Sequence, residues 1–242
     1  MPSAFITGGA KRIGRAIALA LAGRGWDIAL HYLTSESDAQ QTAGEIRALG
    51  RRCELFPADL ADMTQVRELM GQVLSAFPDC NLLVNNASIF ARVNFMQTDE
   101  PHFDRNFAIN FKAPVFLTQD FARNCRQGQV INVLDTKISR PSVNYFAYAM
   151  SKRALADFTL SAARELAPTI RVNGICPGMT LAPADKGSDY LERLSTAVPL
   201  KRPGNPGQIA SAVLFLLDND YVTGQILFID GGEHIGDDIR VE

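Results

Sequence analysis

The sequence predicts an α/β fold: a doubly wound, seven-stranded parallel sheet with helices on both faces. Three observations lead to this fold class. Short apolar runs bounded by turn residues recur along the 242 residues, longer amphipathic segments separate them, and most of the runs are apolar throughout. Such strands are typical of sheets covered on both faces, and strand–helix alternation is typical of parallel crossover units. No Pro/Gly/Ser linker or charge block divides the chain, so residues 1–242 are expected to form a single domain.

Seven strands are expected, in chain order, at Ala4–Thr7, Ile28–Tyr32, Arg52–Phe56, Leu82–Asn85, Gln129–Leu134, Ile170–Ile175 and Ile226–Ile229. Helical periodicity falls between them, at Arg15–Ala22, Asp38–Leu49, Met63–Ala76, His102–Cys125, Tyr145–Leu166 and Pro206–Leu217. The stretch 179–207 is polar and interrupted by Gly and Pro. In an open α/β sheet this position suits a cover over the ligand crevice. On composition alone, a plain surface excursion is an equal alternative.

Composition excludes several classes of protein. With 24 basic and 26 acidic residues, a net charge of −2 and a pI near 6.0, the chain does not suit binding to nucleic acid. No apolar run is long enough to span a bilayer, and no signal peptide is expected at the N-terminus. Metal-ligand spacing is lacking among the four cysteines, which are Cys53, Cys80, Cys125 and Cys176. Reduced thiols, no metal site and a cytoplasmic location are therefore expected.

A glycine-rich turn, Thr7 to Gly14, follows the first strand and opens the first helix. Gly8 permits the tight reversal, and Gly14 allows the helix to lie close to the sheet. The helix N-terminus then offers free N–H groups and a partial positive charge to a pyrophosphate. In this strand–turn–helix context the motif predicts a dinucleotide site of the Rossmann type, although glycines alone also serve ordinary turns.

The residues after the second strand indicate which dinucleotide binds. An NAD-selective site usually places an acidic side chain there, but the segment His31 to Ser35 contains none. Lys11 and Arg12 lie in the neighbouring turn, and Ser35 offers a hydroxyl. Cations and a hydroxyl suit a 2′-phosphate, so the prediction is NADP(H); the alternative is that both cations are solvated surface charges. The cofactor contacts expected from this region are Gly8, Lys11, Arg12, Ile13, Gly14, His31, Tyr32 and Ser35.

Polar residues also follow the third and fourth strands. Asp59 and Leu60 come after the third strand, where Asp59 can hydrogen-bond an adenine edge. The loop from Asn86 to Ser88 comes after the fourth strand. Because the carboxyl ends of parallel strands meet at one edge of the sheet, these residues are expected to line the same crevice. The expected contacts there are Asp59, Leu60, Asn86, Ala87 and Ser88.

A tyrosine and a lysine share one helix face. Tyr148 and Lys152 are four residues apart in a helical segment, so their side chains point from the same side. A nearby ammonium favours phenolate, so the pKa of Tyr148 is expected to fall below its ordinary value of about 10. Tyr148 then serves as a proton donor near neutral pH, and Lys152 is placed to hydrogen-bond a nicotinamide ribose. Taken alone, the pair could equally be solvated on a surface helix.

Taken together, these motifs resemble the short-chain dehydrogenase/reductase family, and the resemblance covers nearly the whole chain. It is carried by the Thr-Gly turn, the Asn-Asn-Ala loop, the Tyr148 and Lys152 pair, and Cys176-Pro177-Gly178 after the sixth strand. The resemblance implies that Asn110, Tyr148, Pro177 and Gly178 lie at the cofactor, and that Asn110 is the family's structural and proton-relay asparagine. Relatives pair the helices matching 102–125 and 147–166 between subunits, which implies a homotetramer. Burial of these helices within one subunit is the alternative.

Three positions depart from the commonest members of that family. Arg12 stands where most carry a second glycine, Ser88 stands where glycine is usual, and Asp135 replaces the serine that precedes the tyrosine by thirteen residues. This combination resembles the pteridine reductases, including the bacterial dihydromonapterin reductase type. The resemblance implies a catalytic group of Asp135, Tyr148 and Lys152, with Arg12 reaching both the cofactor phosphate and the pterin.

The aspartate also fits the chemistry. Reduction of a ketone develops an oxyanion that a carboxylate repels, whereas reduction of a C=N bond sends a proton to nitrogen, which a carboxyl group can supply or relay. Phe90 is expected to stack on a flat ring unless it is a core residue. The expected substrate contacts are Arg12, Ser88, Phe90, Asp135, Tyr148 and Met179.

The sequence thus predicts an NADPH-dependent reductase acting on a C=N bond of a dihydropterin, dihydromonapterin or dihydrofolate. Two alternatives stay open. A carbonyl reductase or alcohol dehydrogenase of the same fold would act on 3-oxoacyl or sugar substrates. A non-catalytic NADP-binding protein would keep only the cleft, and Asp135 in a surface loop would favour it.

Overall fold

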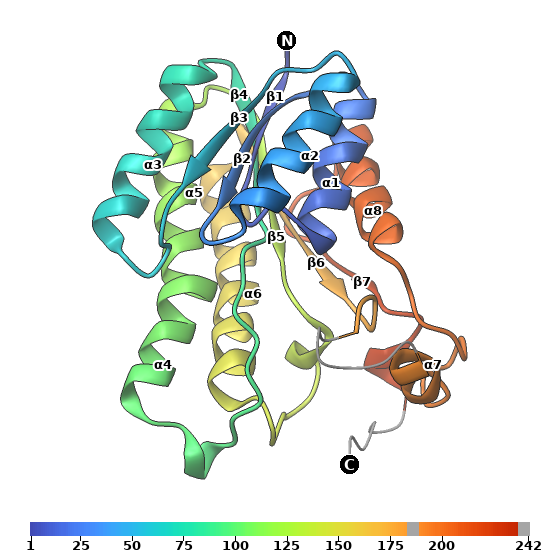
Figure 1. Ribbon diagram of the computed structural model, residues 1–242. Coiled ribbons are helices and arrows are strands. Elements are labelled where there is room, and N and C mark those ends of the chain that lie inside the picture. Colours follow the sequence, from blue (N-terminus) through green and yellow to red (C-terminus); the bar gives the residue numbers. More distant parts are fainter. Residues whose placement is uncertain (183–188, 237–242) are drawn as a thin grey trace.

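The computed structural model describes residues 1–182 and 189–236, and their strands form a seven-stranded sheet in the order β3-β2-β1-β4-β5-β6-β7 (Figure 1). Every neighbouring pair is parallel. The strands are β1 (Ser3–Ile6), β2 (Asp27–Tyr32), β3 (Cys53–Pro57), β4 (Cys80–Asn85), β5 (Gly128–Val133), β6 (Ile170–Pro177) and β7 (Ile226–Ile229). Each lies within two residues of its expected position at both ends. The predicted fold class, a Rossmann-type doubly wound parallel sheet, is confirmed.

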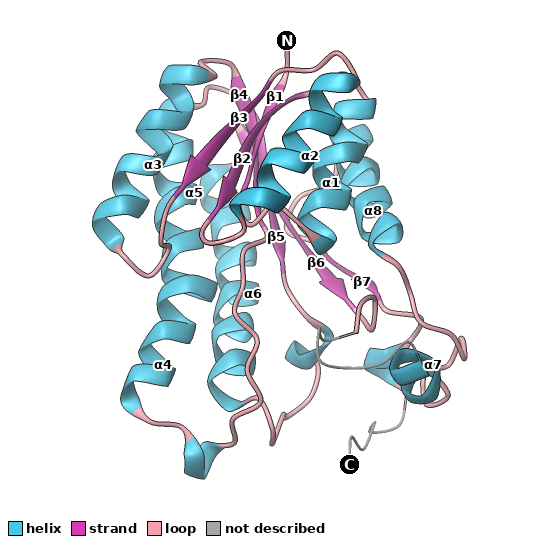
Figure 2. Cartoon of the chain, in the orientation of Figure 1, coloured by secondary structure: helices cyan, strands magenta, loops and turns pink. Residues whose placement is uncertain are grey.

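Helices cover both faces of the sheet. They are α1 (Arg12–Gly23), α2 (Glu36–Ala48), α3 (Met63–Ala76), α4 (Glu100–Phe107), α5 (Ala113–Asn124), α6 (Phe146–Leu166), α7 (Asp189–Ser195) and α8 (Pro206–Asp218). Short helical turns are η1 (Phe95–Gln97), η2 (Ala108–Lys112), η3 (Thr136–Ile138) and η4 (Glu233–Ile235). Helices α1, α2 and α8 cover one face, and α3, α5 and α6 cover the other (Figure 1). The strands end at the edge where loops and α7 gather, as Figure 2 shows.

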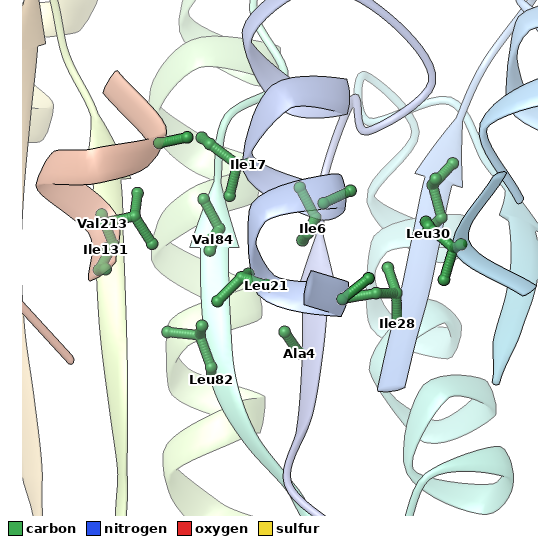
Figure 3. Packing of buried hydrophobic residues seen from close by; sticks show 14 of the residues in the cluster. Ala4, Ile6, Ile17, Leu21, Ile28, Leu30, Leu82, Val84, Ile131 and Val213 are labelled. Atoms are coloured by element: carbon green, nitrogen blue, oxygen red, sulfur yellow. The ribbon is translucent and has the colours of Figure 1, made fainter. Parts of the chain in front are cut away.

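Alternate strand residues pack against opposite helix layers, because successive side chains of a strand point to opposite faces. In β1, Ile6 packs with the α1 and α8 layer and Phe5 with the α3 and α5 layer; both are fully buried. Figure 3 shows the first layer, where aliphatic side chains of four strands lie against α1 and α8. Each large aliphatic side chain buried in this way stabilises the fold by about 1.5–3 kcal/mol. This two-sided burial explains why the strands are continuous apolar runs in the sequence.

The single helix expected at His102–Cys125 is wrong. The chain instead forms α4, the π-helical turn η2 and α5. Pro114 accounts for the break, because a proline lacks the N–H that would bond to residue 110 and its ring crowds that carbonyl. The break therefore falls at Asn110. The seven-residue helix α7 was also not expected, because the stretch 179–207 carries no helical periodicity.

The cysteines are free thiols. Cys53, Cys80 and Cys176 are buried, and Cys125 is half-buried. Burial raises the pKa of the Cys53 thiol to about 12, which keeps the thiol protonated and unreactive. Within residues 1–182 and 189–236, no helix has both the length and the apolar character needed to cross a membrane.

Candidate active site

The carboxyl ends of the strands open into a cavity of about 1080 Å³. Every residue expected to contact cofactor or substrate lines it, with the exception of Asn110. Sequence reasoning missed other lining residues, among them Leu33, Thr34, Arg105, Lys137, Arg140, Tyr145, Tyr190, Leu191, Leu194, Glu233 and His234. The cavity therefore joins the cofactor turn, the expected catalytic group and part of the stretch 179–207. Residues 183–188 of that stretch, and residues 237–242, lie outside the described part of the chain.

The glycine-rich turn closes against the loop that carries Asn86. The Asn86 side-chain amide donates to the Thr7 carbonyl at 2.9 Å and to the Gly8 carbonyl at 3.0 Å. A β-carbon at Gly14 would lie 2.2 Å from the Gly8 carbonyl oxygen, so no larger residue fits there. Arg12 has a φ of 55°, a left-handed conformation that favours glycine. This conformation accounts for the glycine that most of the resembled family carries at that position.

Side chains do not cap the helix N-termini beside this turn. Lys11, at the N-cap of α1, and Ser35, at the N-cap of α2, make no side-chain capping hydrogen bond. The Lys11 side chain is 57% exposed, and its ammonium lies 3.9 Å from the Asp38 carboxylate. N–H groups at a helix start that lack a side-chain partner form a ready anion site. This end of the cavity therefore suits phosphate groups.

His31 supports the glycine-rich turn through hydrogen bonds of both its ring nitrogens. Its Nδ1 accepts from the Gly8 N–H at 3.0 Å, so its Nε2 must carry the proton that it shares with the Ala58 carbonyl, also at 3.0 Å. Burial lowers the pKa of His31 to about 4, which keeps the ring neutral and fixes this tautomer. His31 was expected as a cofactor contact. The structure shows a nearly buried ring whose two hydrogen bonds hold the main chain of the turn and of the β3 loop.

Arg12 connects the turn to the segment that follows β6. Its Nη1 and Nη2 each donate to the Ala182 carbonyl at 3.1 Å, and Nη2 also donates to the Leu181 carbonyl at 3.3 Å. The start of the 179–207 stretch is thereby fastened to α1 across 170 residues of sequence. The contacts of Arg12 with a phosphate and a pterin stay predictions.

The three expected catalytic side chains meet at the cavity floor. Asp135 follows β5 and its Oδ2 accepts from the Tyr148 hydroxyl at 2.6 Å. Its Oδ1 accepts from the Lys137 backbone N–H at 2.8 Å, which fixes the carboxylate. Lys152, one turn beyond Tyr148 on α6, donates to the Val133 carbonyl at 2.7 Å and its ammonium lies 6.0 Å from the Tyr148 ring centroid. Asp135 therefore faces the phenol and does not lie in a surface loop.

The expected lowering of the Tyr148 pKa by Lys152 is wrong in this structure. Burial and then the Asp135 carboxylate raise the pKa of Tyr148 well above its ordinary value. Burial lowers the pKa of Lys152 to about 8, and its ammonium bonds the Val133 carbonyl instead of the phenol. The Asp135 carboxylate lies nearer to the phenol than the Lys152 ammonium does, so its effect on the Tyr148 pKa prevails. The arrangement therefore keeps the phenol protonated, as a proton donor must be.

Asn110 lies behind the cavity instead of lining it. Its side-chain oxygen accepts from the Ile89 N–H at 3.0 Å and from the Ser88 hydroxyl at 3.1 Å. Its amide nitrogen donates to the Ile89 carbonyl and to the Ser151 hydroxyl, both at 3.2 Å. Asn110 thus fixes the loop that carries Ser88 and Phe90, which is an indirect role in the site; its expected direct contact with the cofactor does not fit this placement.

Phe90 forms an aromatic wall with Tyr145, and we use that name for the pair. The two rings stack with centroids 4.4 Å apart and planes 12° from parallel. Phe90 and Tyr148 form a T-shaped pair, with centroids 4.8 Å apart and planes at 80°. Phe90 is 49% exposed, so it is not a core residue. The wall therefore offers aromatic surface next to the expected proton donor.

Glu233 is a carboxyl group in the cavity that sequence reasoning missed. Its Oε1 accepts from the Thr136 hydroxyl at 3.2 Å, and its Oε2 accepts from the Met179 N–H at 3.1 Å. Burial raises the pKa of Glu233. The side chain thereby joins the loop of Asp135 to the loop of Met179. No local motif marks it, because only the crossing from β7 to η4 brings residue 233 to this edge of the sheet.

Comparison with known proteins agrees with this fold. Residues 8–234 match the family model described as enoyl-(acyl carrier protein) reductase. The chain belongs to this family of short-chain dehydrogenases/reductases, and it is therefore an oxidoreductase by family. The predicted family is confirmed.

Three relatives show how widely its members differ. FolM alternative dihydrofolate reductase 1 from Brucella canis, complexed with NADP, is 34% identical and superposes with a TM-score of 0.93 over 98% of this chain and 95% of its own. The 3-oxoacyl-[acyl-carrier-protein] reductase FabG of Staphylococcus aureus is also 34% identical, over 96% of this chain and 98% of its own. Acetoin dehydrogenase YohF from Salmonella typhimurium is 28% identical with a TM-score of 0.89, over 98% of this chain and 97% of its own.

Proposed function

We propose that the protein is an NADPH-dependent reductase that reduces a C=N bond in a pterin-like ring. The observation that carries the proposal is the carboxylate of Asp135 at 2.6 Å from the Tyr148 hydroxyl, inside the cavity. A fixed negative charge there opposes the oxyanion of ketone reduction and favours a cationic or protonated ring nitrogen. The similarity to a FolM structure complexed with NADP supports the same choice.

The residues at the turn fit NADP(H). Only glycine fits at position 14, which leaves main chain exposed to a pyrophosphate at the start of α1. Lys11, Arg12 and Ser35 line the cavity at the end where β2 stops, and the segment 31–35 has no carboxylate to repel a 2′-phosphate. When bound, the reduced nicotinamide supplies the hydride. The part of the chemistry that belongs to the protein is placing the substrate and moving the proton.

Tyr148 and Asp135 share one proton in a short hydrogen bond. The raised pKa of Tyr148 means that the phenol holds this proton, and a ring nitrogen placed beside the pair takes it from either oxygen. Loss of this proton leaves a carboxylate and a phenolate on the pair, and the Lys152 ammonium, which the Val133 carbonyl holds in place, stabilises these two negative charges. Such positioned acid groups contribute about 10²–10⁴-fold to a rate.

Apolar residues of α7 complete the proposed substrate side of the cavity. Leu191 and Leu194 line the cavity. We propose that the described parts of this stretch, 179–182 and 189–207, cover the bound ring there, with Met179 and the aromatic wall on either side. A cavity with apolar walls and a few placed polar groups is the usual form of a site for a flat heteroaromatic ligand.

A substrate panel tests the proposal. NADPH oxidation is measured with dihydromonapterin, dihydrobiopterin and dihydrofolate, and with a 3-oxoacyl thioester, acetoin and a sugar ketone as matched carbonyl substrates. Turnover of at least one pteridine with a kcat/KM well above that of every ketone is expected. A preference for a ketone would establish the carbonyl reductase alternative, and binding of NADPH without turnover of any member would establish the non-catalytic one.

The same proposal includes a homotetramer. Phe103 and Phe107 stack on α4 with centroids 4.5 Å apart, and both are only half-buried within one chain. Leu160, on α6, is 46% exposed. Pairing of α4, α5 and α6 between subunits would bury these side chains. Light scattering on the purified protein is expected to give four times the 26.4 kDa of one chain, and a monomer would contradict this part of the proposal.

A further inference from the structure

Lys137 places a positive charge in the cavity that no acidic side chain neutralises by contact. It lies in η3, two residues beyond Asp135, and it lines the cavity. Among the residues that the structure describes, no carboxylate comes within 4.0 Å of its ammonium, and none of their hydrogen bonds involves that group. The side chain is half-buried. An ammonium in this setting gains most from an anion that is brought by a ligand.

The two nearest acids are engaged elsewhere. Asp135 accepts from the Tyr148 hydroxyl and from the Lys137 backbone N–H. Glu233 accepts from the Thr136 hydroxyl and the Met179 N–H, and the charge of Lys137 acts on it only at longer range. Both carboxyl groups thus have fixed partners, and the Lys137 ammonium stays available.

The ammonium lies beside the aromatic wall. Its Nζ is 5.1 Å from the Tyr145 ring centroid and 5.7 Å from the Phe90 ring centroid. Tyr148, at the reacting end, is 4% exposed, whereas Phe90 is 49% exposed. Phe90 lies near both the Tyr148 ring and the Lys137 ammonium. With the reacting ring at Tyr148 and along Phe90, a group bound at Lys137 belongs to a substituent of that ring.

We propose that Lys137 binds an anionic substituent of the substrate, so that the preferred substrate class is a reduced pteridine whose side chain carries a carboxylate. This inference rests on the proposed function, because it assumes that the pteridine ring lies at Tyr148. It makes Lys137 a specificity-determining residue that is separate from the proton-transferring group. A half-exposed ion pair contributes up to about 1 kcal/mol, which corresponds to about fivefold in affinity.

The test compares Lys137→Met and Lys137→Arg with the unmodified protein. Each is assayed for reduction of dihydrofolate, whose side chain carries carboxylates, and of dihydrobiopterin, whose side chain is neutral. Binding of folate and of biopterin to the NADP-loaded protein is measured in parallel by calorimetry, which needs no turnover. Lys112→Met, which removes an exposed lysine that does not line the cavity, is the matched control.

Lys137→Met is expected to raise the KM for dihydrofolate and the Kd for folate about fivefold, with kcat and the biopterin values unchanged. Lys137→Arg is expected to keep most of the preference for folate over biopterin. Added salt is expected to weaken folate binding by the unmodified protein but not by Lys137→Met. Equal folate binding by the unmodified protein and Lys137→Met overturns the inference, even if pteridines are reduced. Binding of folate that depends on Lys137 without reduction of any pteridine supports the anion site and overturns the proposed function instead.

Discussion

The Tyr148 hydroxyl owes its proton to two features that lie far apart in the chain. Helix α6 buries the phenol, and the loop after β5 supplies the carboxylate of Asp135 at 2.6 Å. Both features raise the pKa of Tyr148, whereas the lysine one turn away lies against a carbonyl of β5. A serine at position 135 would offer a neutral hydroxyl. The phenol would then titrate at a lower pH, and the pocket would tolerate an oxyanion.

Replacing Asp135 and Tyr148 tests whether Tyr148 is the proton donor and whether Asp135 raises its pKa. Tyr148→Phe is expected to abolish pteridine reduction while NADPH still binds, because only the proton donor is lost. Asp135→Ser is expected to reduce the rate about 10²-fold and to shift the ultraviolet titration of Tyr148 to lower pH. Retained turnover in Tyr148→Phe, or an unchanged titration in Asp135→Ser, would falsify the assignment.

His31 makes the folded protein sensitive to acid. Its pKa falls from an ordinary 6.5 to about 4 because the ring is buried in its neutral form. Protonation therefore favours the unfolded chain. The stabilisation is complete above pH 6.5 and decreases as the pH falls toward 4, by at most about 3 kcal/mol at 1.36 kcal/mol per unit.

His31→Asn keeps an acceptor for the Gly8 N–H but has no group that titrates in this range. Urea denaturation at pH 7.5 and at pH 4.5 is expected to show a larger loss of unfolding free energy for the unmodified protein than for His31→Asn. Equal losses would show that another group controls the acid transition. His102→Asn, at a half-buried histidine of α4 that lies outside the cavity, is the control for removing a histidine.

At the level of elements, the docking of α1 on the sheet depends on one glycine. Gly14 lies in the first turn of α1, and a β-carbon there would lie 2.2 Å from the Gly8 carbonyl oxygen and 2.6 Å from the Asn86 side-chain nitrogen. Gly23, at the end of the same helix, has no atom within 4 Å of such a β-carbon. Replacing Gly14 therefore tests the close approach of α1 to the turn, whereas replacing Gly23 tests only the effect of glycine on helix stability.

Gly14→Ala is expected to push α1 away from the turn and so to weaken NADPH binding by at least about tenfold. A tenfold loss of affinity corresponds to about 1.4 kcal/mol of binding free energy. Gly23→Ala is expected to stabilise the protein by about 0.5 kcal/mol with no change in NADPH affinity. Calorimetric titration with NADPH and thermal unfolding measure both effects. Comparable NADPH affinity in the two variants would contradict the role given to Gly14.

For the whole molecule, the apolar runs and the turn at Gly8 were enough to predict the sheet, its two covered faces and the edge where the site lies. Because parallel strands end at one edge, residues as distant as Gly14 and Tyr148 were correctly assigned to one cavity. The break at Asn110 was missed because apolar periodicity continues through the π-helical turn. Glu233 was missed because it lies in no motif and only the folded chain brings it near Asp135. Lys137 is two residues from Asp135 in the sequence, but it lies in no motif either.

Cofactor selectivity can be measured on the whole folded protein. A ligand at one hundred times its Kd stabilises the native state by about 2.7 kcal/mol. At equal concentrations NADPH is expected to raise the Tm more than NADH does, because Lys11, Arg12 and Ser35 suit a 2′-phosphate and no carboxylate lies in 31–35. Equal shifts would contradict the predicted preference for NADP(H).

The hydrogen bonds of Arg12 to the carbonyls of Leu181 and Ala182 have a further consequence. Arg12 belongs to the proposed cofactor turn and also holds the start of the segment proposed to border the substrate. A substitution that alters one of these two regions is therefore expected to alter the other. A change that moves the main chain at 181–182 would also break the hydrogen bonds that hold the Arg12 guanidinium beside the glycine-rich turn. If the proposed function holds, a change at 181–182 is therefore expected to alter substrate range and cofactor affinity together.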